Sequence, residues 1–481
     1  MPLPTLLTFL GYLGLLLVIG AVAFRQTHDL GDYLLGGRRL GPLATALSAG
    51  ASDMSGWLLL GLPGAVYVSG LSEAWIVIGL LAGAFCNWQW VARPLRERTF
   101  ALDAVTLPDY LEARFNDDSR LLRLASAIVI LLFFAFYAAA GLVAGAKLFS
   151  TTFGMDYLTA LFVGGLVIVA YTAVGGFLAV TWTDVVQGLL MLLALVVVPL
   201  VMLADLGGAA ATMSALGGVS DRHLDLVPAS LSALGILSLL AWGLGYFGQP
   251  HVLVRFMAIA SPEGMATAKW IGMSWMLVTT MASVAVGLLG AAWFGVAGES
   301  LPAGDAEKVF IRATQLLFNP WIAGILLAAI LAAVMSTIDS QLLVASSALS
   351  EDFYKAWLKP DADAKELVIV GRMTVVAIAG VAMVIALDPA RQVLGLVSYA
   401  WAGLGASFGP VILLSLYGNP TRTGALAGMI TGAATVVVWK PLSGGPFGIL
   451  GVYELLPAFL FALIVIVTVS RLTQSSADTL T

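Results

Sequence analysis

Residues 50–57 read GASDMSGW and lie inside the apolar stretch LGPLATALSAGASDMSGWLLLGLPGAVYV, residues 40–68. This stretch is long enough to cross a bilayer, since about 20 apolar residues span the hydrocarbon core as a helix. Its middle nevertheless carries the carboxylate Asp53 between serines and glycines. A charged side chain at the bilayer centre costs at least ~2.5–3.5 kcal/mol on insertion scales, so an intramembrane carboxylate indicates a functional residue. The stretch predicts a membrane helix that is interrupted at Ser48–Gly56, with Asp53 either capping the break or tuning the charge of a site beside it.

The composition indicates a membrane protein along the whole chain. Of 481 residues, 60% are hydrophobic and 11% are charged, against about 25% charged residues in an average soluble protein. Backbone groups in lipid must be hydrogen-bonded within the protein, so long apolar segments are either helices or strands of a closed barrel. The apolar segments here are too long and too uniform for barrel strands, which alternate in character. We therefore predict an all-α membrane protein with one domain over residues 1–481.

Thirteen transmembrane helices are predicted. They cover residues 4–24, 41–67, 72–92, 121–149, 156–179, 184–204, 229–256, 270–297, 319–350, 367–387, 391–417, 423–440 and 451–470. When the N-terminus is placed outside, 17 of the 23 Lys and Arg residues fall on the inner side, and retained positive charge marks the cytoplasmic side. We therefore predict a multi-pass protein of the cytoplasmic (inner) membrane, with the N-terminus outside and the C-terminus inside.

Several functional classes lack their sequence signals. The single cysteine, Cys86, excludes an internal disulfide, and the three histidines are far apart. The chain has no P-loop pattern for nucleotide binding and no basic run for nucleic acid. No cluster of His, Cys, Asp and Glu has catalytic spacing. These observations argue against an enzyme, an ATP-driven pump and a nucleic-acid-binding protein.

A second interrupted span lies at the corresponding place later in the chain. Residues 239–254 read LLAWGLGYFGQPHVLV, with Gly243, Gly245, Gly248 and Pro250 close together. Glycine in one such span would indicate close helix packing. Two interrupted spans at matching positions instead indicate the binding site of a secondary transporter built from an inverted repeat. We predict a five-plus-five repeat over residues 41–204 and 229–417, with one extra helix in 1–40 and two in 418–481.

The broken helix and the ninth span together predict an ion site. An unwound turn frees backbone carbonyls, which suit a hard cation, and a half-helix N-terminus suits a carboxylate. Residues 324–355 read GILLAAILAAVMSTIDSQLLVASSALSEDFYK. Ser336, Asp339 and Ser340 share one helical face, with Thr337 beside them. Four oxygen-bearing side chains in an otherwise apolar span indicate a wet surface that faces a cation.

Two further charged residues lie near predicted span ends. Asp184, in TWTDVVQG, either completes the ion site or caps the start of a helix. Arg255 ends the seventh span, and we expect its side chain to snorkel to the inner surface.

Three long stretches resemble the sodium:solute symporter family. They are ASDMSGWLLLGLPGAVYVSGLSEAW (51–75), WGLGYFGQPHVLVRFMA (242–258) and ILAAVMSTIDSQLLVASSALSEDFYK (330–355), and the likeness extends over nearly the whole chain. The resemblance implies a LeuT-type inverted-repeat fold with thirteen helices. It also implies coupled entry of sodium and L-proline through the lipid bilayer, with no cofactor and no required protein partner.

The resemblance further implies roles for named residues. Sodium would be held by the carbonyls of Ala51, Met54 and Ala333 and the hydroxyls of Ser336 and Thr337. L-Proline would contact Ser55, Gly56, Trp57, Tyr137, Trp242, Tyr246 and Pro250. Asp53 would support sodium dependence. Aromatic faces suit the proline ring and attract its ammonium group by roughly 0.5–2 kcal/mol.

Asp339 departs from the family pattern, in which a small hydroxyl residue is more usual. We therefore hypothesise that Asp184, Ser336, Asp339 and Ser340 bind a second cation, or that Asp339 carries a proton. The alternatives at this stage are symport of another small solute, and a proton in place of sodium. A passive channel and a membrane receptor are further alternatives from other classes.

Overall fold

The computed structural model describes residues 3–24, 30–172, 176–219, 223–442 and 451–474. In these ranges the chain is helical, and the one extended pairing is an isolated bridge between Leu40 and Ile259. Ten helices of the described ranges are long and apolar enough to cross a membrane. The prediction of an all-α, multi-pass membrane protein is thereby confirmed. Residues 173–175 of the fifth predicted span lie outside the described residues.

The described residues up to Val219 form eleven α-helices and four short 3₁₀- or π-helical turns. They are α1 (Leu3–Phe24), α2 (Leu30–Leu35), η1 (Gly36–Arg38), α3 (Pro42–Asp53), η2 (Trp57–Gly61), α4 (Leu62–Ser69), η3 (Gly70–Glu73), α5 (Ala74–Cys86), η4 (Asn87–Ala92), α6 (Arg93–Ala101), α7 (Leu107–Phe115), α8 (Leu121–Phe153), α9 (Tyr157–Thr172), α10 (Phe177–Asp205) and α11 (Ala209–Val219).

The second half continues the helical order through the described residues. Its elements are α12 (Ala233–Leu240), η5 (Ala241–Gly248), α13 (Pro250–Ala258), η6 (Pro262–Gly264), α14 (Met265–Ala297), η7 (Pro302–Gly304), η8 (Ala306–Lys308), α15 (Val309–Leu317), α16 (Pro320–Ser347), η9 (Ala348–Leu358), α17 (Ala364–Ile385), α18 (Val393–Tyr417), α19 (Arg422–Leu442) and α20 (Leu455–Gln474).

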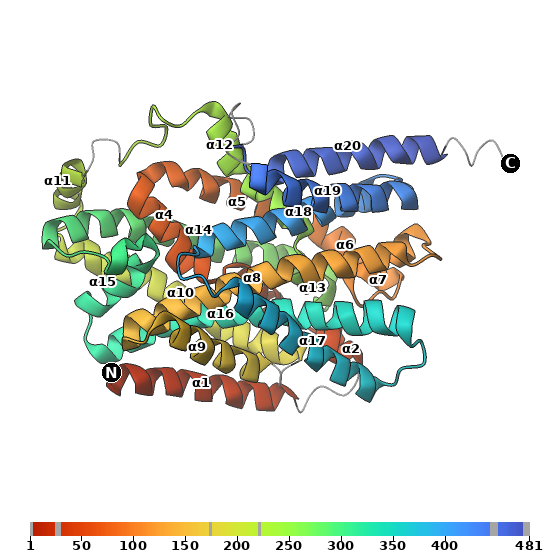
Figure 1. Cartoon of the computed structure of the whole chain (residues 1–481), viewed down its shortest axis with the longest axis horizontal. Coiled ribbons are helices and arrows are strands. Elements are labelled where there is room, and N and C mark those ends of the chain that lie inside the picture. Colours follow the sequence, from red (N-terminus) through yellow and green to blue (C-terminus); the bar gives the residue numbers. More distant parts are fainter. Residues whose placement is uncertain (1–2, 25–29, 173–175, 220–222, 443–450, 475–481) are drawn as a thin grey trace.

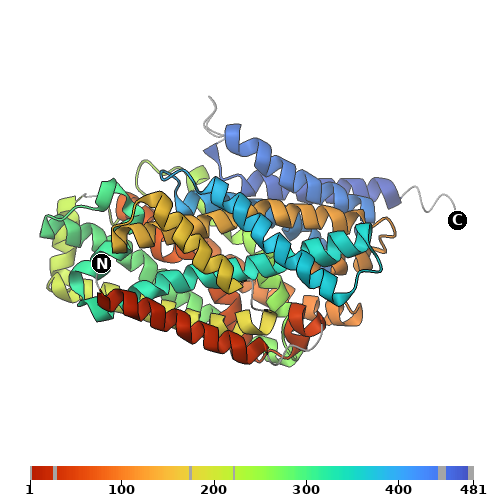
Figure 2. The same ribbon diagram turned by 60° about the horizontal axis from the view of Figure 1, so that its bottom comes forward.

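The helices run largely along one direction, with α8, α16 and α18 in the interior (Figure 1). Of the most apolar part of Pro320–Leu358, 83% is buried, whereas the corresponding value for α1 is 22%. Helices α1, α17, α19 and α20 lie at the periphery, where Figures 1 and 2 show them on the outside of the bundle. Their exposed leucines, valines and isoleucines suit contact with lipid chains.

Both predicted interruptions are present. Helix α3 stops at Asp53, Met54 leaves helical geometry with φ −84° and ψ 73°, and η2 resumes the chain as a π-helical turn. In the second interrupted span, α12 passes into the 3₁₀-helical η5, and Gln249 is extended before Pro250 starts α13. The proline fixes the helix start because it needs no backbone donor at the first helical position.

Glycines bring the second interrupted helix against α5. A Cβ atom on Gly83 would lie 2.1 Å from the carbonyl oxygen of Gly243, and one on Gly79 would lie 2.4 Å from that of Leu240. Small residues allow such close backbone approach between membrane helices. These contacts fix η5 against α5 and so determine where the second break lies.

Arginines tie several helix ends together at the end of the bundle opposite to the N-terminus. The Arg98 guanidinium donates to the carbonyls of Ser415 and Leu416 at the end of α18, both at 2.5 Å. Arg38 donates to the carbonyls of Ala104 at 2.7 Å and Met257 at 3.3 Å. Cations suit helix C-termini because the last carbonyls lack helical partners. These arginines therefore hold the ends of neighbouring helices together.

The close contact between α5 and η5 predicts the effect of one added side chain. Gly83→Val places three carbons where the Gly243 carbonyl lies, and overpacking of this kind costs about 1–3 kcal/mol. We expect a lower melting temperature and a smaller yield of monodisperse protein in detergent. The matched control is Gly380→Val on α17, because a Cβ atom there meets nothing within 4 Å. Equal melting temperatures for the two variants would contradict the packing assigned to Gly83.

Candidate functional site

A cluster of oxygens joins the broken helix α3 to α16. The Ser336 hydroxyl lies 2.8 Å from the carbonyl oxygen of Ala51 and 3.1 Å from that of Ala333. The Thr337 hydroxyl lies 3.4 Å from the same Ala51 carbonyl. All of these residues are buried, and Met54 lies directly after the last turn of α3. The structure thus brings together four of the five residues predicted to hold sodium, with Met54 at the break beside them.

The chemistry of this cluster suits a small hard cation. Carbonyl and hydroxyl oxygens are neutral ligands of the type such cations prefer. The Ala51 carbonyl lies in the last turn of α3, where the helix C-terminus carries partial negative charge. A hydroxyl group has two acceptor lone pairs in addition to its proton, so Ser336 and Thr337 can serve as ligands as well as donors.

Asp53 lies at the break, between two tyrosines. The Tyr246 hydroxyl on η5 donates to its Oδ2 atom at 2.5 Å, and the Tyr137 hydroxyl on α8 donates to its carbonyl oxygen at 3.3 Å. The carboxylate is 3% exposed, and in the described residues its Oδ1 atom has no hydrogen-bond partner. The bond from Tyr246 to the Asp53 carboxylate therefore connects the two broken helices, while the Asp53 carbonyl also accepts a hydrogen bond from the Ser55 amide at 3.0 Å.

Aromatic rings form a wall next to the breaks. The rings of Trp57 and Trp242 lie 6.2 Å apart, and Trp242 stacks on Tyr453 at 5.2 Å. Tyr246 meets the ring of Trp401 edge-on at 5.0 Å. The Trp401 indole nitrogen donates to the backbone carbonyl of Trp242 at 2.8 Å, which orients the Trp401 ring. One buried aromatic wall thus contains Trp57, Trp242 and Tyr246, which were all predicted to contact the solute.

Gly56 occupies a position with no room for a side chain. A Cβ atom there would lie 2.7 Å from the Ala144 methyl group on α8 and 3.3 Å from Val334 on α16. The neighbouring Ser55 is 2% exposed, and its hydroxyl accepts a hydrogen bond from the Trp57 amide at 3.5 Å. Close packing at Gly56 holds the unwound turn against the two interior helices.

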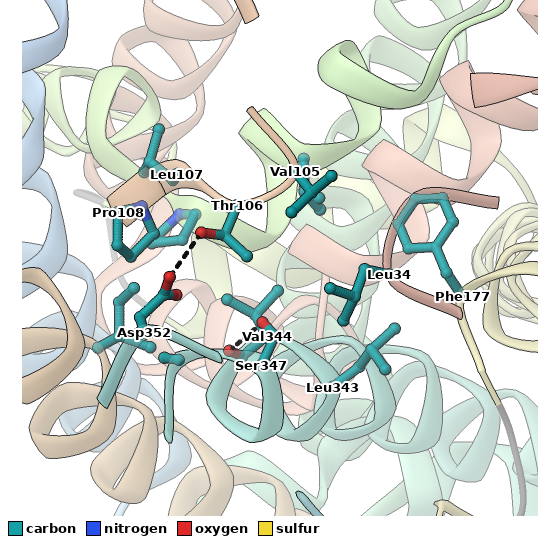
Figure 3. Close-up of a pocket in the computed structure, with 14 residues that line it drawn as sticks. Leu34, Val105, Thr106, Leu107, Pro108, Phe177, Leu343, Val344, Ser347 and Asp352 are labelled. Carbon is teal, nitrogen blue, oxygen red and sulfur yellow. Dashed lines mark hydrogen bonds between the residues drawn. The ribbon is translucent and has the colours of Figure 1, made fainter. Parts of the chain in front are cut away.

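One cavity beside the break of α3 is lined by Asp53, Met54, Tyr246 and Asn87, among others. A second cavity, shown in Figure 3, is lined by Pro250, Thr106, Asp352 and Phe177 together with apolar side chains. Pro250 therefore lines a different cavity from the one that Asp53 and Tyr246 line. In Figure 3, Thr106 donates to Asp352, a bond of 2.9 Å.

The expectation for Arg255 is wrong. Its side chain is 0% exposed and turns into the protein instead of reaching the surface. One terminal nitrogen, Nη2, lies 3.2 Å from Asp184 Oδ2 and 2.5 Å from the Ser340 hydroxyl. The Nε atom donates to the Ser48 hydroxyl at 3.0 Å. Carboxylate and hydroxyl partners inside the bundle thus replace the water that a snorkelling arginine would reach.

Asp184 does not cap a helix start. Helix α10 begins at Phe177, with Gly176 in the capping position, so Asp184 lies about two turns inside it. Its Oδ2 atom accepts a hydrogen bond from the Ser48 hydroxyl at 2.6 Å. Together with Ser340, which lies one turn after Ser336 on α16, it forms a buried polar cluster. Asp339, one residue before Ser340, is also 0% exposed.

Sequence reasoning missed several polar residues of the site. Asn87 on η4 is 1% exposed, and both polar atoms of its side chain lack hydrogen-bond partners among the described residues. Ser48 and Trp401 were also missed, although Ser48 bonds Asp184 and Trp401 bonds Trp242, two residues predicted for the site. The signal for Asn87 was available, since an amide after thirteen mostly apolar residues of α5 is unusual for a membrane helix. In the described ranges, no group of three His, Cys, Asp or Glu residues has the geometry of a metal site.

This arrangement, with two broken helices that meet at a buried polar site, defines the protein as a secondary transporter in structural class. Residues 33–432 match the sequence model of the sodium:solute symporter family. The chain belongs to this family.

Relatives agree with this assignment, and solved structures of low sequence identity share the fold. The chain is 54% identical to the sodium/proline symporter of Escherichia coli K12 over 98% of this chain and 93% of that protein. It is 52% identical to the high-affinity proline transporter PutP of Bacillus subtilis over 97% and 98% of the two chains. A Na⁺-coupled sialic acid symporter shares the fold, with a TM-score of 0.83 at 19% identity and 98% of each chain covered. A nucleobase-cation-symport-1 transporter, Mhp1, covers 92% of this chain and 96% of its own with a TM-score of 0.57 at 14% identity.

The oxygen cluster predicts a loss of stabilisation by sodium when one hydroxyl is removed. A ligand present at 100 times its Kd stabilises the folded state by about 2.7 kcal/mol. We expect sodium, in place of potassium, to raise the melting temperature of the purified protein, and Ser336→Ala to remove most of that rise. The control is Ser407→Ala. Ser407 is also fully buried, but it lies on α18, where its hydroxyl donates to the Gly403 carbonyl. An undiminished sodium response in Ser336→Ala would rule out this hydroxyl as a ligand.

Proposed function

We propose that this protein couples the inward movement of sodium to the uptake of L-proline by alternating access. The observation that carries the proposal is the oxygen cluster of Ala51, Ala333, Ser336 and Thr337, which lies at the break of α3 next to Asp53. Membership in the sodium:solute symporter family supports sodium as the coupled ion. The names of its relatives support proline as the solute.

The residues beside the cluster suit proline. This amino acid is a compact apolar ring with a carboxylate and a secondary ammonium group. Trp57, Trp242 and Tyr246 offer aromatic faces, which attract a cation by roughly 0.5–2 kcal/mol. Of the backbone amides at the start of η2, those of Ser55 and Trp57 donate to the Asp53 carbonyl and the Ser55 hydroxyl. The Gly56 amide between them is the donor that we propose for the solute carboxylate, because amides at a helix start attract a carboxylate. In this proposal Tyr137 closes the solute site from α8, whereas Pro250 lines the separate cavity of Figure 3 and contributes by starting α13 directly after the second break.

Sodium binding and solute binding meet in the same turn of chain. Ala51 belongs to the last turn of α3, and Ser55 to Trp57 follow within six residues. A cation at the Ala51 carbonyl draws that turn toward Ser336 and Thr337 on α16. The position of Trp57 and of the adjacent amides then depends on the ion, which is the physical basis of coupling. Asp53 transmits the same constraint to η5 through Tyr246.

The proposal includes the architecture and the orientation expected from the sequence. Residues 41–204 and 229–417 would be the two inverted repeats, and thirteen spans would place the N-terminus outside the cytoplasmic membrane. The arginine-rich helix ends that join α6 and α18 would then face the cytoplasm, in agreement with the retention of positive charge there.

The energetics of such coupling are adequate for accumulation of the solute. One positive charge that moves inward gains about 2.3 kcal/mol per 100 mV of membrane potential. A tenfold sodium gradient adds roughly 1.4 kcal/mol. Together these terms sustain a solute gradient of about 500-fold.

Radiolabelled L-proline uptake into proteoliposomes tests the proposal. We expect uphill uptake with an inward sodium gradient and none with potassium or proton gradients of equal size. Asp53→Asn should reduce sodium-driven uptake by about 10- to 100-fold, since hydrogen bonds to charged groups contribute about 1.5–3 kcal/mol. The control is Asp205→Asn at the end of α10, whose carboxylate accepts one bond from Trp293 and lies away from the break.

The other outcomes identify the alternatives. If a proton gradient drives uptake equally well, the proton and not sodium is the coupled ion. Asp339 would then be the first candidate for the group that carries the proton. Folded protein that accumulates no proline in any gradient would contradict proline as the solute, and other small solutes would be screened in the same vesicles. Uptake that never exceeds equilibrium would indicate a passive channel.

A further inference from the structure

Asn87 is a buried amide with unused hydrogen-bonding capacity. It is 1% exposed, and neither its Oδ1 nor its Nδ2 atom has a hydrogen-bond partner among the described residues. It is the first residue of η4, where the chain changes from α-helical to π-helical geometry. A buried polar group without partners is costly, so such groups in proteins are nearly always hydrogen-bonded, often to an ordered water. The Asn87 amide therefore indicates a bound molecule beside it.

A second buried group with unused capacity lines the same space. The cavity beside the break of α3 is lined by Asp53, Met54, Tyr246 and Asn87, together with residues that carry small or apolar side chains. The Asp53 Oδ2 atom accepts a hydrogen bond from the Tyr246 hydroxyl. Its Oδ1 atom has no hydrogen-bond partner in the part of the chain that the structure describes. A carboxylate oxygen and an amide thus lie on one cavity, and each lacks a partner.

Packing on both sides of Asn87 fixes its place at this cavity. One turn earlier, Gly83 lets α5 approach η5 so closely that an added Cβ atom would lie 2.1 Å from the Gly243 carbonyl oxygen. One residue later, the Trp88 ring lies 4.4 Å from the Phe256 ring on α13, measured between centroids. Both contacts hold η4 against the second interrupted span. Since neither contact uses the Asn87 side chain, a substitution at Asn87 leaves them in place.

The size and the chemistry of the cavity identify the bound molecule as water. The cavity volume is about 20 Å³, and one water needs roughly 10–15 Å³, so L-proline is too large for this space. The side-chain oxygens on the lining belong to Asp53, Asn87 and Tyr246, and the Tyr246 hydroxyl already donates to Asp53. These are few ligands for a sodium ion, which takes several oxygens. A water can accept from Asn87 Nδ2 and donate to Asp53 Oδ1, which gives it two partners.

We propose that Asn87 positions the Asp53 carboxylate through one bound water molecule. The water links η4 to the end of α3, and the Tyr246 hydroxyl links the same carboxylate to η5. Asp53 thereby connects irregular turns from three different spans. The dependence of sodium binding on Asn87 rests on the proposed function, to which it adds a residue that sets sodium affinity. Asn87 is a positioning residue, because it contacts neither the ion nor the solute.

The water affects sodium through the last turn of α3. Asp53 follows Ala51 by two residues, and the Ala51 carbonyl is the oxygen that the Ser336 and Thr337 hydroxyls contact. Rotation of the Asp53 side chain away from Tyr246 would release this turn from η5. A water on Oδ1 holds the second carboxylate oxygen and so opposes that rotation. Loss of the water should therefore weaken sodium binding while the helices stay packed.

The sodium affinity of Asn87→Leu tests the role of the amide. Leucine has the same number of side-chain heavy atoms as asparagine, but it cannot form a hydrogen bond. Purified protein is melted over a series of sodium concentrations, with choline keeping the total salt constant, and the rise in melting temperature gives an apparent Kd for sodium. We expect this Kd to be about 10-fold higher in Asn87→Leu, because a hydrogen bond to a charged group is lost. Asn87→Ser keeps a hydroxyl and leaves room for a further water, so its Kd should stay within about threefold of the wild type.

A merely structural role of Asn87 would give a different result. Asn87→Leu would then melt at a lower temperature in choline and keep the wild-type Kd for sodium. The matched control is Gln89→Leu on the same turn. Gln89 is exposed, and its side-chain oxygen accepts a hydrogen bond from Lys269 Nζ at 2.7 Å, so its replacement should leave the Kd unchanged.

A double variant shows whether Asn87 acts through Asp53. Asp53→Asn removes the charge to which the water donates, and it should weaken sodium binding by itself. Adding Asn87→Leu to Asp53→Asn should then raise the Kd by less than about twofold, since two residues that act through one interaction are not additive. A further rise of about 10-fold would mean independent action of the two residues and would overturn the proposal.

An electron cryo-microscopy map that resolves ordered waters identifies the bound molecule. We expect one peak within hydrogen-bond distance of Asp53 Oδ1 and the Asn87 amide, both in sodium and in choline. No peak there, a peak that disappears in choline, or an unchanged Kd in folded Asn87→Leu would each overturn the proposal. A wild type whose melting temperature does not respond to sodium would instead contradict the proposed function, and the map would still decide whether the water is bound.

Discussion

The Met54 amide makes the last hydrogen bond of α3, to the Gly50 carbonyl, and the Ala51 carbonyl instead accepts from hydroxyls of α16. The bonds from Ser336 and Thr337 hold the end of α3 in a place where lipid offers no replacement partners. The other features of the site depend on this one. The unwound turn exposes backbone groups, Gly56 packs it against α8 and α16, and Asp53 connects it to η5.

Asp53 and Asp184 are buried carboxylates near this turn, and the protein stabilises them with different partners. Asp53 is held by a tyrosine hydroxyl at the break, next to the aromatic wall. Asp184 is paired with the Arg255 guanidinium one layer further along α3 and α16. Burial of a charge is expensive unless it is paired and hydrogen-bonded. An unpaired carboxylate beside neutral oxygens suits a mobile cation, whereas a carboxylate with its own arginine suits a fixed structure.

Much of this arrangement could be predicted from the sequence, for a physical reason. In an apolar chain, Asp53, Ser336 and the glycines of the second break stand out, so both interruptions and the face of α16 were found. Trp57, Trp242 and Tyr246 came from the resemblance to a family. Arg255 could not be assigned correctly, because an arginine at a predicted span end suits snorkelling equally well. Its partners Asp184, Ser340 and Ser48 are 71, 85 and 207 residues away, and only the fold brings them together.

Coupling in this protein requires a sodium ion between the end of α3 and α16, and an electron cryo-microscopy map tests this most directly. Two maps of the purified protein would be compared, one in sodium and one with sodium replaced by choline. We expect density in the sodium map within ligand distance of the Ala51 carbonyl and the Ser336 and Thr337 hydroxyls, and no such density in choline. Equal maps at this position, or sodium density at Asp184 in place of it, would contradict a sodium site between α3 and α16.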